Sequence, residues 1–97
     1  MSRTYFVECY WPGVREHDVA DAVERLAREP AGEEPVALVE SILVPADEIV
    51  LCVFEGPSVE AVRASAHGCG LPAERIVDCV QVPARGTASY TGEGGEQ

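Results

Sequence analysis

The chain begins with a mostly apolar run that is rich in aromatic and β-favouring residues, which is typical of a β-strand. Residues 4–11 read Thr-Tyr-Phe-Val-Glu-Cys-Tyr-Trp, and Pro12-Gly13 ends the run. Further along, the spacing of apolar residues becomes that of a helix, and the acidic residues Glu16 and Asp18 lie near its start. Apolar residues recur at helical spacing at Val19, Ala22, Val23 and Leu26. Pro30 stops this pattern, so the sequence predicts an amphipathic helix that ends at about Arg28.

The second half of the chain repeats the scheme after a hairpin. Strand patterns cover residues 36–44 and 48–55, and the short connection Pro45-Ala46-Asp47 makes them neighbours. Ser58 is a suitable N-cap for a second helix, and Gly68 or Gly70 can supply the left-handed residue at its end. A last strand is predicted over residues 75–82.

This order of elements predicts a ferredoxin-like α+β fold, strand–helix–strand–strand–helix–strand. Two split strand–helix–strand units with right-handed crossovers give a four-stranded antiparallel sheet in the order 4-1-3-2, with both helices on one face. We expect this domain to cover residues 1–83. Residues 84–97 are rich in Gly, Thr, Ser and Glu, and are predicted to form a flexible tail.

Three of the predicted strands carry a carboxylate between large apolar residues at alternate positions. These sets are Phe6, Glu8 and Tyr10; Leu38, Glu40 and Ile42; and Ile76, Asp78 and Val80. If all three sets point away from the helices, that face is too apolar to remain in water. Pairing two sheets face to face would bury it and form a dimeric α+β barrel, with Glu8, Glu40 and Asp78 at or near the interior and Tyr10 lining the cavity or the interface.

Carboxylates enclosed in such a cavity could act as a general base or bind a metal ion. Alternatively, they contact solvent at the sheet edges or pair with arginines across the dimer. Cys52 shares a strand face with Val50 and Phe54, which favours core packing over a thiolate role. His17 and Asp21 stand four residues apart on the first helix and could hold a transition metal, although a solvated acidic helix is the simpler explanation.

Composition narrows the classes of function. The chain has 97 residues, 46% of them hydrophobic, and a formal net charge of −10 from 17 acidic and 7 basic residues. Such acidity argues against nucleic acid and against an anionic membrane as partners. The start of the chain shows no pattern of a secretion signal, so we expect a cytoplasmic protein. The four cysteines form no Cys-x-x-Cys pair, and no hydrolase triad, phosphate loop or zinc-protease motif is present.

Three segments resemble a family of short bacterial ferredoxin-like proteins, a former domain of unknown function with a nickel-binding member. They are Tyr5-Phe6-Val7-Glu8, the segment from Cys52-Val53-Phe54-Glu55 to Arg63, and Gly70-Leu71-Pro72-Ala73-Glu74-Arg75-Ile76. The resemblance spans about residues 4–82 and implies the same fold, dimerisation and nickel binding. Its motifs fall on Glu8 and Cys52, which the resemblance makes candidate site residues.

The sequence thus predicts a small homodimer that binds nickel, another divalent metal or a small cavity ligand. One alternative is a cofactor-free barrel enzyme, similar to monooxygenases or isomerases, with Glu8 or Asp78 as the base. Another is a non-catalytic module that docks a larger protein through its sheet face or its acidic helix.

Overall fold

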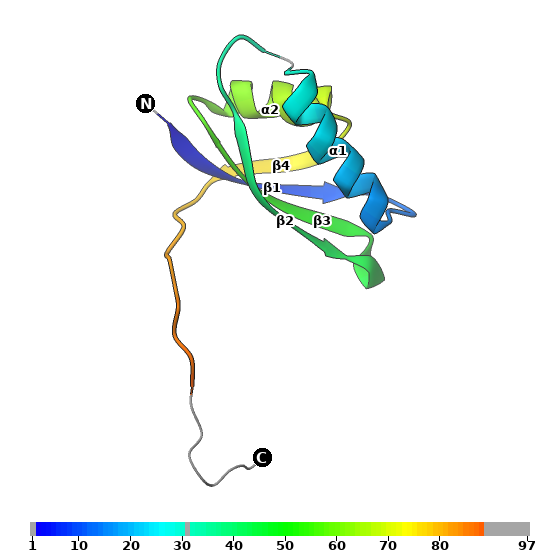
Figure 1. Cartoon of the computed structure of the whole chain (residues 1–97), viewed down its shortest axis with the longest axis vertical. Helices are drawn as coiled ribbons and strands as arrows, with labels where there is room; N and C mark the ends of the chain where they lie inside the picture. Colours follow the sequence, from blue (N-terminus) through cyan, green and yellow to red (C-terminus); the bar gives the residue numbers. More distant parts are fainter. Residues whose placement is uncertain (1, 31, 89–97) are drawn as a thin grey trace, which may run out of the picture.

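The computed structural model describes residues 2–30 and 32–88, which form one four-stranded sheet and two helices (Figure 1). The elements in chain order are β1 (Arg3–Tyr10), α1 (Glu16–Arg28), β2 (Ala37–Val44), the 3-10 turn η1 (Pro45–Asp47), β3 (Ile49–Gly56), α2 (Val59–Gly68) and β4 (Ala73–Asp78). The strands lie in the order β2-β3-β1-β4, and every neighbouring pair is antiparallel. Read from the other edge, this is the predicted order 4-1-3-2. The ferredoxin-like fold is confirmed.

Local signals in the sequence explain where the helices begin and end. The Asp18 carboxylate accepts a hydrogen bond from the backbone N–H of Arg15 at 2.8 Å, which satisfies a donor at the start of α1. At α2, Ser58 Oγ accepts from the Ala61 N–H at 3.1 Å, as predicted for an N-cap. Gly70, with φ of +92°, supplies the left-handed turn that leads from α2 towards β4.

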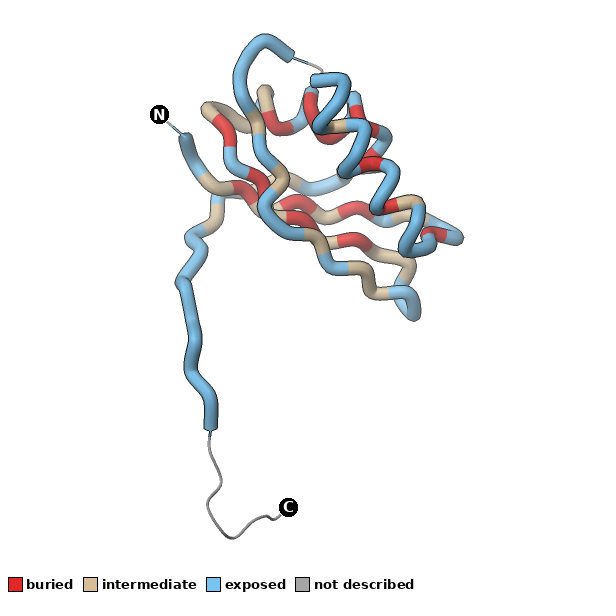
Figure 2. Tube along the Cα trace, viewed as in Figure 1, coloured by how far each residue is buried: buried red, intermediate tan, exposed pale blue. Residues whose placement is uncertain are grey.

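The core lies between the helices and one face of the sheet. Figure 2 shows the buried positions on the central strands and on the inner sides of the helices. The largest fully buried side chains include Phe54, Leu71, Val7, Val50 and Val62. Within the described residues, neither helix is long and apolar enough to cross a membrane.

The central strands place their side chains as the alternation predicts. On β1, Tyr5, Val7 and Cys9 are buried under the helices, so Phe6, Glu8 and Tyr10 point the other way. Strand β3 buries Val50, Cys52 and Phe54 in the same manner. We call the sheet surface away from the helices the open face; its central part is formed by Phe6, Glu8, Tyr10, Ile49, Leu51 and Val53.

Strand β2 departs from strict alternation at Val39. Leu38 pairs with Phe54 and Glu40 with the next residue, Val53, so Val39 is the extra residue of a β-bulge. Leu38 therefore lies on the helix side, where it packs against the core. Glu40 and Ile42 lie on the open face, opposite Val53 and Leu51. The prediction that Leu38 shares a face with Glu40 and Ile42 is wrong, because the bulge reverses the alternation between them.

The side chains of strand β4 point to the faces opposite to those that the dimer hypothesis assumed. Asp78 pairs with Tyr5 and Ile76 with Val7, both of which face the helices, whereas Arg75 pairs with Glu8 on the open face. The expectation that Asp78 joins Glu8 and Glu40 on one face is wrong, because Ile76 turns inward to pack against the core. The strand also ends at Asp78, four residues earlier than predicted.

After β4 the chain forms no helix or strand as far as residue 88, and residues 80–88 are exposed (Figure 2). Residues 89–97 of the predicted tail lie outside the described residues. The domain boundary at residue 83 stays a prediction.

Candidate functional site

Glu8 lies near the centre of the open face. It stands between Leu51 of β3 and Arg75 of β4, and the Arg75 guanidinium lies 3.4 Å from the Glu8 carboxylate. The Glu8 side chain is 41% exposed and that of Arg75 58%. An ion pair this exposed contributes about 0–1 kcal/mol at most. It therefore orients Glu8 rather than holding the fold together.

Glu40 lies on the same face but not beside Glu8. Strand β3 separates their strands, with Val53 next to Glu40 and Leu51 next to Glu8. Two strand spacings put the two backbones about 10 Å apart. In one copy of the chain, an apolar strip of β3 thus divides the two carboxylates, and they do not form a joint site.

Tyr10 borders the open face at the end of β1. Its hydroxyl lies 3.5 Å from Glu48 Oε1, while Glu48 Oε2 accepts from the Gly13 N–H at 2.9 Å. The Glu48 carbonyl accepts a further bond from the Trp11 N–H at 2.7 Å. Glu48 has a left-handed backbone, with φ of +56°. This residue fastens the β2–β3 connection to the loop after β1, a role that its place in the sequence does not reveal.

Asp78 and Cys52, both predicted to contribute to the cavity, lie on the helix side of the sheet. Asp78 is exposed at the rim of a hollow of about 500 Å³ that Arg3, Ser58 and Glu60 also line. Cys52 is fully buried. Neither of them can meet Glu8 on the open face, because the sheet lies between.

The Cys52 thiol forms a pair with that of Cys9 on the neighbouring strand β1. A hydrogen bond between the two thiols, together with burial, raises the pKa of Cys52 far above its usual value. The same bond lowers the pKa of Cys9. Cys69 is buried as well, and burial raises the pKa of its thiol. All three are free thiols, so these cysteines serve core packing in the reduced chain.

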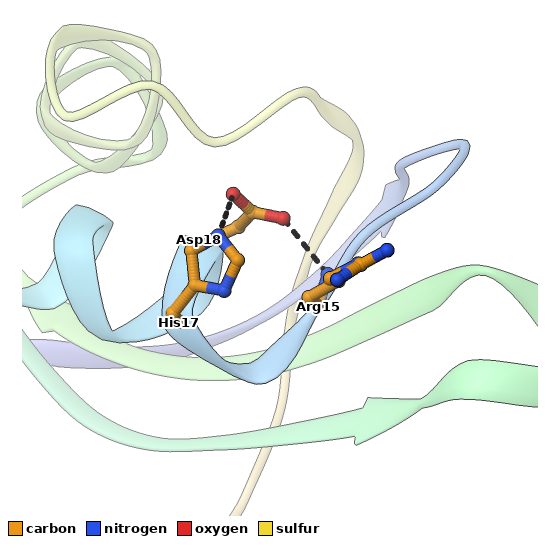
Figure 3. Close-up of polar contacts among 3 residues, drawn as sticks. All are labelled: Arg15, His17 and Asp18. Carbon is orange, nitrogen blue, oxygen red and sulfur yellow. Dashed lines mark hydrogen bonds and ion pairs between the residues drawn. The ribbon is translucent and has the colours of Figure 1, made fainter.

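On α1, His17 contacts its neighbour in sequence. Its Nε2 lies 3.3 Å from Asp18 Oδ1, and Asp18 Oδ2 is the atom that caps the helix at Arg15 (Figure 3). Asp21 is exposed one turn further along. The helix therefore offers an exposed imidazole and nearby carboxylates, of which Asp18 is already engaged.

These donors do not amount to a complete metal site in one copy. Across residues 2–30 and 32–88, no three side chains of His, Cys, Asp or Glu come close enough together to hold an ion. Imidazole and carboxylate are suitable ligands for nickel, but one described chain brings no more than two such groups together.

Sequence reasoning missed Arg75, Glu48 and Ser65. Arg75 lies on the open face only because of the way the side chains of β4 alternate, and the sequence does not show which of them face that side. Ser65 is 3% exposed and lies on the buried side of α2, three residues after Val62. Its helical spacing was a usable signal, since a serine in an apolar stripe points to an unusual buried hydroxyl.

The fold and the open face define the class: a small ferredoxin-like α+β domain with acidic side chains set among apolar ones on the sheet face away from the helices. The chain belongs to the family of SCO4226-like nickel responsive proteins, whose sequence profile matches residues 5–79. The resemblance found in the sequence is thereby confirmed.

A solved structure has the same fold. The crystal structure of SCO4226 from Streptomyces coelicolor A3(2) superimposes with a TM-score of 0.68 and is 23% identical in sequence. The match covers 84% of this chain and 99% of that one. At this identity the likeness shows the fold alone. A comparison with functionally curated proteins finds no match.

Proposed function

We propose that this protein is a non-catalytic, cytoplasmic homodimer that binds nickel or another divalent transition metal ion. Membership of a family described as nickel responsive carries the metal part of this proposal. The open face supports the dimer, because half-buried Phe6, Leu51 and Val53 lie at its centre and Ile42 beside them is 51% exposed.

Dimerisation also bears on the ligands. A single described chain groups fewer than three donors, so we expect the metal ion to take ligands from two copies. Face-to-face pairing would bring a second Glu8 and a second Glu40 to the same interface. It would also remove water from the carboxylates, which strengthens their attraction for a cation.

Leu51 offers the sharpest test, because it lies at the centre of the open face and away from the core. We expect Leu51→Lys to yield a monomer and to weaken nickel binding at least tenfold. Val80→Lys is the matched control, since Val80 is 84% exposed and follows the last strand. Light scattering after size exclusion and calorimetry with nickel, on protein without a histidine tag, give both quantities. A monomeric parent protein, or no nickel heat at micromolar protein, would overturn the proposal.

A second pair of variants distinguishes a metal site between the two sheets from a metal site on α1. His17→Ala tests the imidazole of α1, and His67→Ala is its control, because these are the two histidines of the chain. If nickel is held between sheets, both variants bind it as the parent does. Loss of binding in His17→Ala alone, with Leu51→Lys still binding, would move the site to α1.

A further inference from the structure

A groove runs between α1 and the edge strand β2, on the helix side of the sheet. Figure 1 shows the two elements side by side, joined by the loop before β2. One hollow of about 480 Å³ is lined by Val23, Leu26 and Ala27 of α1 and by Pro35, Val36 and Leu38 opposite. A second hollow of about 610 Å³ continues from Val23 towards Leu43 and Pro45. We call both together the α1–β2 groove.

The size and lining of the groove are those of a small-molecule site. Such sites are commonly a few hundred cubic ångströms, mostly apolar, with a few polar groups that fix orientation. Val23 lies where the two hollows meet and is 41% exposed, although it belongs to the apolar stripe of α1. Helix and strand thus leave apolar surface uncovered between them.

The groove also contains a buried polar group. Ser65 of α2 lines the first hollow and is 3% exposed. Among the residues that the structure describes, its hydroxyl has no hydrogen-bond partner. A buried hydroxyl without a partner destabilises the fold, and nearly all such groups in proteins are satisfied by protein, water or ligand.

The charges around the groove have one sign. Glu34 and Glu55 line the first hollow and are exposed, and Glu16 lines the second. No Lys or Arg among the described residues lines either one. This arrangement attracts a cation and repels a carboxylate or phosphate.

We propose that the α1–β2 groove binds a small amphiphilic amine. The protonated amine lies near Glu34 and Glu55, the hydrocarbon or aromatic body packs on Val23 and Leu26, and a hydroxyl or carbonyl of the ligand bonds to Ser65 Oγ. The site is on the opposite side of the sheet from the open face, and it needs neither nickel nor a second copy.

Three related compounds test each part of this recognition. Tyramine carries an ammonium, an aromatic ring and a hydroxyl at the far end; phenethylamine lacks the hydroxyl; 3-(4-hydroxyphenyl)propionate replaces the amine by a carboxylate. In nitrogen–proton NMR titrations of the full chain, we expect tyramine at millimolar concentration to shift the amide signals of groove residues. Phenethylamine should bind severalfold more weakly, and the propionate at least tenfold more weakly.

Variants assign the contacts to residues. Ser65→Ala should reduce tyramine affinity to that of phenethylamine and leave phenethylamine binding unchanged. Ala27→Trp should fill the groove and abolish binding, whereas Ala64→Trp is the matched control, because Ala64 is also exposed on a helix but does not line the groove. Circular dichroism confirms that each variant folds.

Three results would overturn the proposal: groove signals that do not move with tyramine, a propionate that binds as tightly as the amine, or unchanged tyramine affinity in both Ser65→Ala and Ala27→Trp. None of these results bears on nickel binding or on the oligomeric state. The two proposals therefore fail or succeed separately.

Discussion

Arg25 of α1 bonds to the end of α2, and a single methyl group added at Gly70 should disturb this contact. The Arg25 guanidinium donates a hydrogen bond at 2.8 Å to the carbonyl of Cys69, at the end of α2. The next residue, Gly70, has φ of +92°, and a Cβ placed there would lie 2.8 Å from Arg25 Nη1. Gly70→Ala therefore strains the backbone and also pushes the guanidinium, the end of a flexible side chain, away from the Cys69 carbonyl.

The two effects can be estimated separately. A positive φ costs a residue with a Cβ about 1–2 kcal/mol. A hydrogen bond from a charged donor contributes about 1.5–3 kcal/mol, and the lower end suits this partly exposed arginine. Because the guanidinium ends a flexible side chain, a small shift weakens the bond before it is lost, and we expect Gly70→Ala to lower the free energy of unfolding by about 2–3 kcal/mol. In a domain of this size that corresponds to a fall in Tm of roughly 8–24 °C.

Chemical denaturation of a double-mutant cycle isolates the contact. Arg25→Met removes the hydrogen bond beforehand, so Gly70→Ala should then cost only its backbone strain, about 1–2 kcal/mol. Gly13→Ala is the matched control, because Gly13 also has a positive φ, +75°, but open space around its Cβ position. If Gly70→Ala costs the same with and without Arg25, the steric reasoning is refuted.

The buried thiols allow two further predictions. The pKa of Cys52 is raised in the folded chain, so above its ordinary value of 9.0 the unfolded chain releases a proton that the folded chain keeps. The free energy of unfolding should therefore fall as pH rises above about 9. Cys52→Ala alone leaves Cys9 without the bond that lowers its pKa, so burial then raises the pKa of Cys9 and the slope persists. Replacing both thiols, Cys9→Ala with Cys52→Ala, should reduce the slope by about 1.4 kcal/mol per pH unit in urea titrations; a slope equal to that of the parent would contradict this. With a chromogenic disulfide reagent at neutral pH, half-buried Cys79 should react first and Cys9, Cys52 and Cys69 only on unfolding; a rapid second thiol would show that the core opens.

The elements and their order could be predicted because each one carries its own signal. Strand β1 is rich in aromatic and β-favouring residues, prolines and glycines stand at the connections, and Ser58 marks the start of α2. Because side chains alternate between the two faces of a strand, the faces of β1 and β3 could be predicted, and Glu8 and Tyr10 lie on the open face as expected. Local pattern decides such features, and no distant residue is needed to interpret them.

The candidate site depended on register, which is set by contacts between distant strands. Isoleucine and aspartate alternate with arginine and valine in β4, and either pair could face the core. Ile76 packs against the core, and Asp78, two residues further along the strand, therefore also lies on the helix side. Whether Glu8 and Glu40 ever meet a metal ion depends in turn on a second copy, which no pattern within one chain specifies.

The β-bulge at Val39 bears on how the protein stays in solution. Strand β2 is an edge of the sheet, and a regular edge is a template on which further chains can add their own strands. The unpaired residue interrupts the regular hydrogen-bonding pattern of β2 and twists the strand locally. Concentrated solutions should accordingly resist fibre growth, and a shortened chain without Val39 should lose that protection.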